Sequence, residues 1–132
     1  MRLLLHAALV ASGSALGGLA RWGLHALAVR LLGKSWPYGT FLINVTGCLL
    51  LGWLAAVLTQ RIKLHDEAGV DEIRLLVGVG FCGAYTTFST FGVESDSLFR
   101  AGSLTAGYLY VGLSVLCGLL AVRLGVYLGG GV

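Results

Sequence analysis

Four hydroxyl side chains lie close together in an otherwise apolar part of the sequence, where they could contribute to an ion-binding site. They fall within the glycine-containing segment Gly80–Phe91, at Thr86, Thr87, Ser89 and Thr90. The segment is too polar for an ordinary lipid-facing helix, so we expect the helix to break near Gly83–Thr86. Backbone carbonyl oxygens freed at such a break coordinate hard monovalent cations. A simple kink, with hydroxyls bonded back to the helix, fits the same residues equally well.

Two phenylalanines follow the expected break and define a candidate anion path. Phe88 and Phe91 are three residues apart, so they project from one face of the helix that restarts there. An aromatic ring has a positive edge, and a small anion passing ring edges is partly compensated without meeting a full positive charge. Taken alone, this spacing is more typical of core or lipid-facing residues.

Two other apolar segments carry short polar stripes. Asn44 lies in the run Phe41–Val45, where an unpaired amide is costly, so it requires a partner or a pore. Thr40 lies one turn earlier on the same face, and Tyr110 and Ser114 are likewise four residues apart. Together these side chains could form a track of hydrogen-bond donors.

The charges closest to being embedded are Arg21 and Glu94. Either could be an interfacial residue that extends its charged group to water, or half of a structural ion pair. A structural role fits them better than a role in transport.

The histidines and cysteines form no pattern typical of catalysis or metal binding. The histidines have no neighbouring carboxylate, serine or cysteine in the spacing of a catalytic triad. The cysteines are isolated within apolar segments and are best explained as packing residues. These residues are His6, His25 and His65, and Cys48, Cys82 and Cys117. Nothing in the sequence indicates an enzyme.

The composition places the chain in a membrane. Of 132 residues, 57% are hydrophobic and only 11% are charged, and a span needs roughly 20 apolar residues. The chain is therefore long enough for four helical spans in one all-α domain over residues 1–132. We expect these spans at about residues 3–32, 38–59, 73–98 with the break, and 103–128.

The remaining segments fit this layout. The hydrophilic stretch Gln60–Glu72 is expected to be the loop between the second and third spans. The apolar run Leu3–Ala20 resembles a signal peptide, but its helical pattern continues beyond that length, so we interpret it as the first span. The net charge of +3 is scattered between spans and is typical of membrane-interface residues rather than of nucleic-acid binding.

Three motifs resemble those of the Fluc (CrcB) fluoride channels. They are Gly17–Trp22, with the sequence GGLARW, Tyr38–Gly47, with the sequence YGTFLINVTG, and Gly83–Phe91, with the sequence GAYTTFSTF, followed by Glu94. The resemblance covers essentially the whole chain.

This resemblance implies a passive, fluoride-selective channel in the inner (plasma) membrane that lowers cytoplasmic fluoride. It implies an antiparallel, dual-topology homodimer with two pores and a central structural Na⁺, which the carbonyl oxygens of Gly83 and Thr86 would hold. The residues implied to line the fluoride path are Asn44, Phe88, Phe91, Thr40, Ser89, Thr90, Tyr110 and Ser114. Arg21 and Glu94 match family positions with no assigned role.

The sequence departs from the family pattern at two positions. Ala84 stands where the family often has glycine, and Gly118 stands where the polar stripe of the last span often continues with serine. Carbonyl coordination is indifferent to the methyl group of Ala84 if that residue keeps a negative φ. Neither departure threatens the function, although conductance could differ.

Two other functions are compatible with a small four-span protein. A dual-topology, proton-coupled exporter of the small multidrug resistance type has a similar length and hydropathy. It needs an embedded carboxylate, usually in the first span, and Leu3–Leu32 contains no Asp or Glu. A non-transporting assembly factor is a weaker alternative.

The positive charges are divided almost evenly between the two sides of the membrane. The side with both termini would carry five, Arg2, Arg61, Lys63, Arg74 and Arg123, and the other side four, Arg21, Arg30, Lys34 and Arg100. The positive-inside rule then favours neither orientation, so chains are expected to insert both ways.

Overall fold

The computed structural model describes residues 1–63 and 69–130, which form helices and no strand. Four helical stretches are long and apolar enough to cross a membrane: Arg2–Leu32, Tyr38–Gln60, Val70–Arg100 and Leu104–Leu128. The elements are α1 (Arg2–Leu32), α2 (Tyr38–Lys63), α3 (Val70–Ile73), η1 (Arg74–Cys82), α4 (Gly83–Tyr85), α5 (Phe88–Arg100) and α6 (Leu104–Leu128). The expected all-α, four-span membrane fold is confirmed.

The connection between the second and third spans is shorter than the sequence predicted. Helix α2 continues to Lys63 and α3 already begins at Val70, so both ends of the expected loop Gln60–Glu72 are helical. The middle of that predicted loop, residues 64–68, lies outside the described residues.

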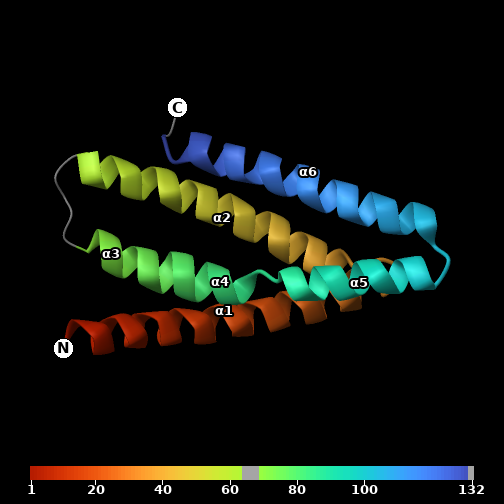
Figure 1. Ribbon diagram of the computed structural model, residues 1–132, viewed down its shortest axis with the longest axis horizontal. Coiled ribbons are helices and arrows are strands. Elements are labelled where there is room, and N and C mark those ends of the chain that lie inside the picture. The colour runs from red at the N-terminus through yellow and green to blue at the C-terminus, as the bar shows by residue number, and fades with distance from the viewer. Residues whose placement is uncertain (64–68, 131–132) are drawn as a thin grey trace.

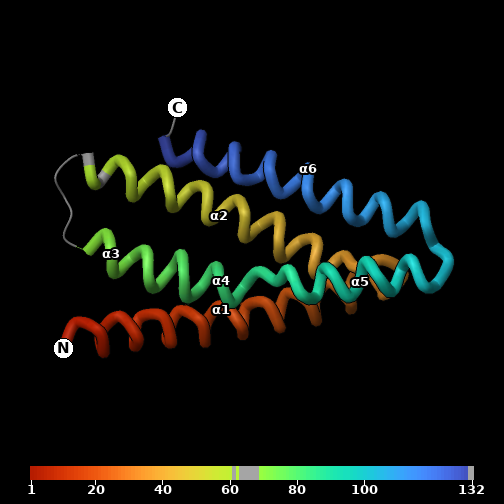
Figure 2. The backbone as a smooth tube through the Cα atoms, viewed as in Figure 1, coloured from red at the N-terminus to blue at the C-terminus, as the bar shows by residue number. Residues whose placement is uncertain are grey.

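The spans pack as two neighbouring pairs. In Figures 1 and 2, α1 runs beside η1 and α4, while α2 runs beside α6. Glycines allow both close approaches, because a Cβ atom at Gly17 would collide with the carbonyl oxygen of Phe81, and one at Gly52 with that of Val122. Small residues at helix contacts are the usual means by which membrane helices associate.

The third span changes its helical form before it breaks. Residues Arg74–Cys82 form a π-helix, a rare geometry in which backbone bonds reach one residue further than in an α-helix. The sequence analysis did not predict this segment. After one further helical turn, Thr86 and Thr87 are extended, with ψ angles of 160° and 113°.

The position of the break requires a correction. Gly83, expected to lie in unwound backbone, is helical, with φ of −63° and ψ of −37°. The extended residues are Thr86 and Thr87, and Figure 1 shows them as the thin link between α4 and α5. The break is thus shorter than predicted and lies at the C-terminal end of the expected range.

The break also changes the neighbours of the third span. Before it, η1 and α4 pack mainly against α1, whereas α5, after it, packs mainly against α6. Figure 1 shows the two parts on either side of the link.

Most large apolar side chains lie on the outside of the described chain, including Leu19 on α1 and Leu119 on α6. A surface of this kind is stable in lipid, so the chain is a multi-pass membrane protein.

Candidate ion-binding site

The break is held open by one side chain from another helix. The Nδ2 group of Asn44 on α2 donates a hydrogen bond to the backbone oxygen of Thr87 at 3.1 Å. The backbone N–H of Thr87 donates in return to Oδ1 of Asn44 at 2.9 Å. The amide of Asn44 therefore satisfies both backbone polar groups of an extended residue, as a neighbouring β-strand would.

Two carbonyl groups lose their helical donors because of this arrangement. In a continuous α-helix, the N–H of Thr87 would serve the carbonyl oxygen of Gly83, but here it donates to Asn44. The N–H of Thr90 would serve the carbonyl oxygen of Thr86, but it donates to Oγ1 of Thr87 at 3.2 Å. Gly83 and Thr86 are the residues whose carbonyls the sequence analysis singled out.

The threonine hydroxyls divide between two roles. The Oγ1 group of Thr86 donates back to the carbonyl oxygen of Cys82 at 2.9 Å, as expected for the kink interpretation. Thr87 instead caps the N-terminus of α5, and its hydroxyl also donates to Thr90 Oγ1 at 3.0 Å. Ser89 Oγ lies 3.3 Å from the same hydroxyl of Thr87.

A cavity of about 380 Å³ lies beside the break. Six of the predicted site residues line it, together with Thr87: Asn44, Gly83, Thr86, Phe88, Phe91 and Ser114. Ser114 Oγ is buried there without a hydrogen-bond partner among the described residues, so its donor is available to a bound group. Among the described residues that line this cavity, none carries a charge.

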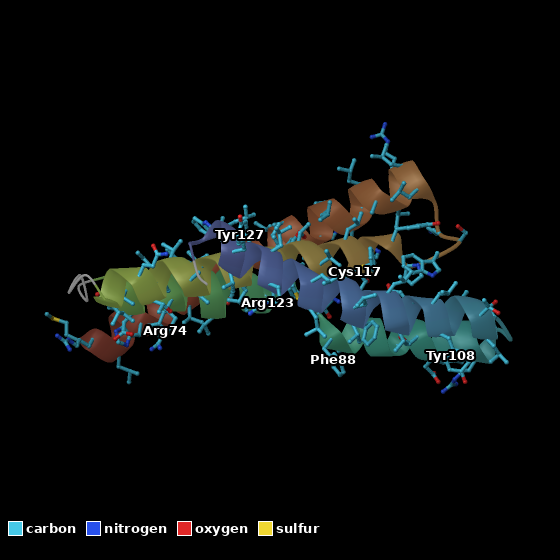
Figure 3. All side chains as sticks on the ribbon, turned by 90° about the horizontal axis from the view of Figure 1, so that it is seen from above. Arg74, Phe88, Tyr108, Cys117, Arg123 and Tyr127 are labelled. Carbon is cyan, nitrogen blue, oxygen red and sulfur yellow. The ribbon has the colours of Figure 1, made fainter. Side chains whose placement is uncertain are left out.

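The two phenylalanines begin a row of aromatic rings that runs away from the break. The ring centroids of Phe88 and Phe91 are 5.7 Å apart, and Phe91 lies 5.2 Å from Tyr110. Trp36, next in the row, meets Tyr110 edge-on at 5.1 Å. Phe88 is exposed and projects away from the helices in Figure 3.

Glu94 has a defined place beside this row. Its carboxylate accepts a hydrogen bond from Thr40 Oγ1 at 2.9 Å and another from Tyr110 Oη at 2.7 Å. Thr40 and Tyr110 are buried. The carboxylate thus links three helices, α2, α5 and α6, and occupies the hydroxyls of two residues predicted to line the ion path.

Arg21 lines a second cavity, of about 390 Å³, which also borders the break. Thr40, Thr87 and Thr90 also line it. Thr87 therefore borders both the uncharged cavity and the cavity that contains a guanidinium group.

Sequence reasoning located most of these residues but missed how they interact. The N-cap role of Thr87 has a sequence signal, a threonine directly before a helical segment. No local pattern could show that Asn44 pairs with residue 87 or that Glu94 joins Thr40 and Tyr110. Those contacts depend on how distant helices pack.

We expect Tyr110→Phe to lower the stability of the folded protein, because it removes a buried donor from Glu94. Loss of a hydrogen bond to a charged group costs about 1.5–3 kcal/mol. The thermal unfolding midpoint in detergent would measure the effect. Tyr108→Phe on the same helix is the matched control, because Tyr108 is 70% exposed and lies at the edge of the molecule in Figure 3. Equal midpoints for the two variants would contradict a stabilising role of the Tyr110 bond.

Comparison with known proteins identifies the family. A family model described as "CrcB-like protein, Camphor Resistance (CrcB)" matches residues 8–126. Curated relatives named "Fluoride-specific ion channel FluC" match over most of their length. The Dehalococcoides mccartyi protein is 41% identical over 121 residues, 92% of this chain and 89% of the relative. The Chloroflexus aurantiacus protein is 42% identical over 120 residues, 91% of each chain.

A third relative of the same name, from Acidobacterium capsulatum, is 44% identical over 120 residues, which make up 91% of this chain and 92% of the relative. The family model covers most or all of each span, the break and the residues around both cavities. This chain therefore belongs to the CrcB-like protein family.

Proposed function

We propose that this chain forms a fluoride-selective channel that lets fluoride leave the cell passively and so lowers its cytoplasmic concentration. The observation that carries this proposal is the uncharged cavity beside the break. It combines two aromatic rings with hydrogen-bond donors from Asn44 and Ser114. The relatives' printed name supports the same function.

The contents of this cavity suit a small, strongly hydrated anion. A pore must replace the water of such an ion without binding it too tightly to be released. The edges of Phe88 and Phe91 offer weak, spaced compensation, while the Ser114 hydroxyl offers a directional hydrogen bond. A lysine or arginine in the cavity would bind the ion more tightly and slow its release.

The neighbouring cavity supplies the attraction that the first one lacks. The guanidinium of Arg21 raises the local concentration of anions there, and the hydroxyls of Thr87 and Thr90 lie at the same cavity. Because Thr87 borders both cavities, fluoride that is drawn toward Arg21 arrives next to the uncharged cavity. This gives Arg21 a role in permeation, whereas its sequence position had favoured a structural one.

The main alternative, a proton-coupled exporter of the small multidrug resistance type, is less well supported. The first span has no Asp or Glu to exchange protons. The embedded carboxylate, Glu94, is hydrogen-bonded to Thr40 and Tyr110 rather than facing the uncharged cavity.

We expect proteoliposomes containing the protein to release fluoride but not chloride without a proton gradient. Phe88→Ile or Phe91→Ile should lower the fluoride rate by more than about tenfold, equivalent to over about 1.4 kcal/mol of barrier. Asn44→Asp should be at least as harmful, because its carboxylate repels the anion and replaces the donor to Thr87.

The matched control is Tyr127→Ile, which removes an exposed aromatic ring at the other end of α6. This variant should conduct at the parent rate. All variants would first be shown to be folded by size-exclusion chromatography. Parent-level flux in the Phe88, Phe91 and Asn44 variants would contradict the assignment of the pore to this cavity.

We also propose a structural Na⁺ held by the carbonyl oxygens of Gly83 and Thr86. Support comes from the diverted donors, since the N–H groups of Thr87 and Thr90 bond to side chains instead of these carbonyls. Gly83 is exposed, and the space beside it is open. A second copy related by a two-fold axis would contribute the same pair, giving four carbonyl oxygens around one ion.

We expect replacement of sodium by a large organic cation, throughout purification and assay, to abolish fluoride flux or to dissociate the dimer. Four converging carbonyls without a cation would repel one another in a dry interface. Returning sodium should restore activity. Unaltered flux, together with a sodium-free structure that has no cation density between Gly83 residues, would refute this site.

The proposed dimer is antiparallel. The start of α1 and the end of α6 lie toward the same end of the helices as the end of α2 and the start of α3 (Figure 1), and the positive charges number five on that side and four on the other. This distribution supports insertion in both orientations.

We expect a single cysteine introduced between residues 60 and 72 to be labelled from each side in about half of the copies, as an unbiased insertion requires. Cys48, Cys82 and Cys117 would be replaced first, so that only the new thiol reacts. Labelling from one side only would exclude dual topology.

A further inference from the structure

His25 on α1 stands between two cavities. One is the cavity of about 390 Å³ that also contains Arg21. The other, of about 330 Å³, is lined by the connection from Gly33 to Pro37, the start of α2 and part of α5. Among the described residues, His25 is the only one that lines both of these cavities.

The backbone of α2 fixes the position of the imidazole. A Cβ atom at Gly39 would lie 2.6 Å from Nδ1 of His25, so the ring lies directly against this glycine. His25 is nevertheless exposed, and it lines the same cavity as the charged residues Lys34 and Glu94.

Charged and titratable groups surround His25 on both sides. Arg21 lies one helical turn earlier on α1. It lines the cavity of about 390 Å³, which we call the inner cavity. The cavity of about 330 Å³, which we call the outer cavity, is lined by Lys34, Tyr38 and Glu94. Lys34 lies in the connection between α1 and α2, Tyr38 on α2 and Glu94 on α5. The outer cavity thus holds charges of both signs, whereas Arg21 gives the inner cavity a positive one.

The cavities follow one another in a row. Thr87 borders the uncharged cavity and the Arg21 cavity, and His25 borders the Arg21 cavity and the outer one. An anion that moved along this row would pass His25 before it reached Arg21.

We propose that His25 is a protonatable anion-attracting residue at the entrance to the Arg21 cavity, and that its positive form increases fluoride conduction. This inference rests on the proposed channel function. Histidine is the side chain that ordinarily gains a positive charge between about pH 8 and pH 5. Protonation adds a second positive charge beside Arg21 and offsets the negative charge of Glu94 across the outer cavity.

The test is the fluoride current of the full-length protein in planar bilayers, at about pH 8 and about pH 5.5, which bracket the range in which histidines change charge. A current measurement excludes the leak of neutral hydrogen fluoride. We expect the parent current to rise by about threefold or more at the lower pH, and to rise less at high salt because the charge is screened. His25→Gln should abolish this rise and keep the parent current measured at about pH 8.

Two further variants make the outcome specific to the charge on His25. His25→Lys should give the higher current at both pH values, because its charge persists. His6→Gln, which removes the other described histidine of α1, should keep the parent pH dependence. A pH-independent parent current, or a pH dependence that survives in His25→Gln, would overturn the inference while leaving the channel function intact. A parent without fluoride current would overturn both.

Discussion

The pairing of Asn44 with the backbone of Thr87 is the interaction on which the other features of the site depend. A hydrocarbon environment offers no water to unpaired peptide groups, so an extended residue within a span must find partners in the protein. Asn44 supplies both a donor and an acceptor to Thr87. Because Thr87 is held extended, its hydroxyl can cap α5, and the carbonyls of Gly83 and Thr86 lose their usual donors. One amide thus creates the helix terminus and the free oxygens together.

Helix α2 provides the frame for the broken span through three residues on one face. Thr40, Asn44 and Gly47 follow one another at helical spacing and contact Glu94, Thr87 and Thr86 respectively. A side chain at Gly47 would collide with the methyl group of Thr86, so the glycine sets how closely the break approaches α2. The same face of one helix therefore positions residues before, at and after the break.

The sequence was sufficient to predict the spans and the residue types of the site, because apolar runs and embedded polar residues are local signals. It could not predict the π-helix at Arg74–Cys82, which has no distinctive local pattern, and it predicted a break over Gly83–Thr86 that the structure confines to Thr86 and Thr87. Glycine is tolerated in membrane helices, whereas the break at Thr87 requires a partner on α2, Asn44, which lies 43 residues away in the sequence. The role of Glu94 was missed for the same reason.

In the proposed channel, the separation of charge from the uncharged cavity would let attraction and release coexist in one small protein. Arg21 would draw the anion at long range, whereas a guanidinium in the narrow part of the path would hold it too strongly. The carboxylate of Glu94 would repel the same ion if it were bare. Its two hydrogen bonds, from Thr40 and Tyr110, direct donors at its oxygens and fix it away from the cavity of Phe88 and Phe91. The aromatic row beside it continues from Phe88 through the buried Tyr110 to Trp36, so the rings tie the cavity to the helices that hold Glu94.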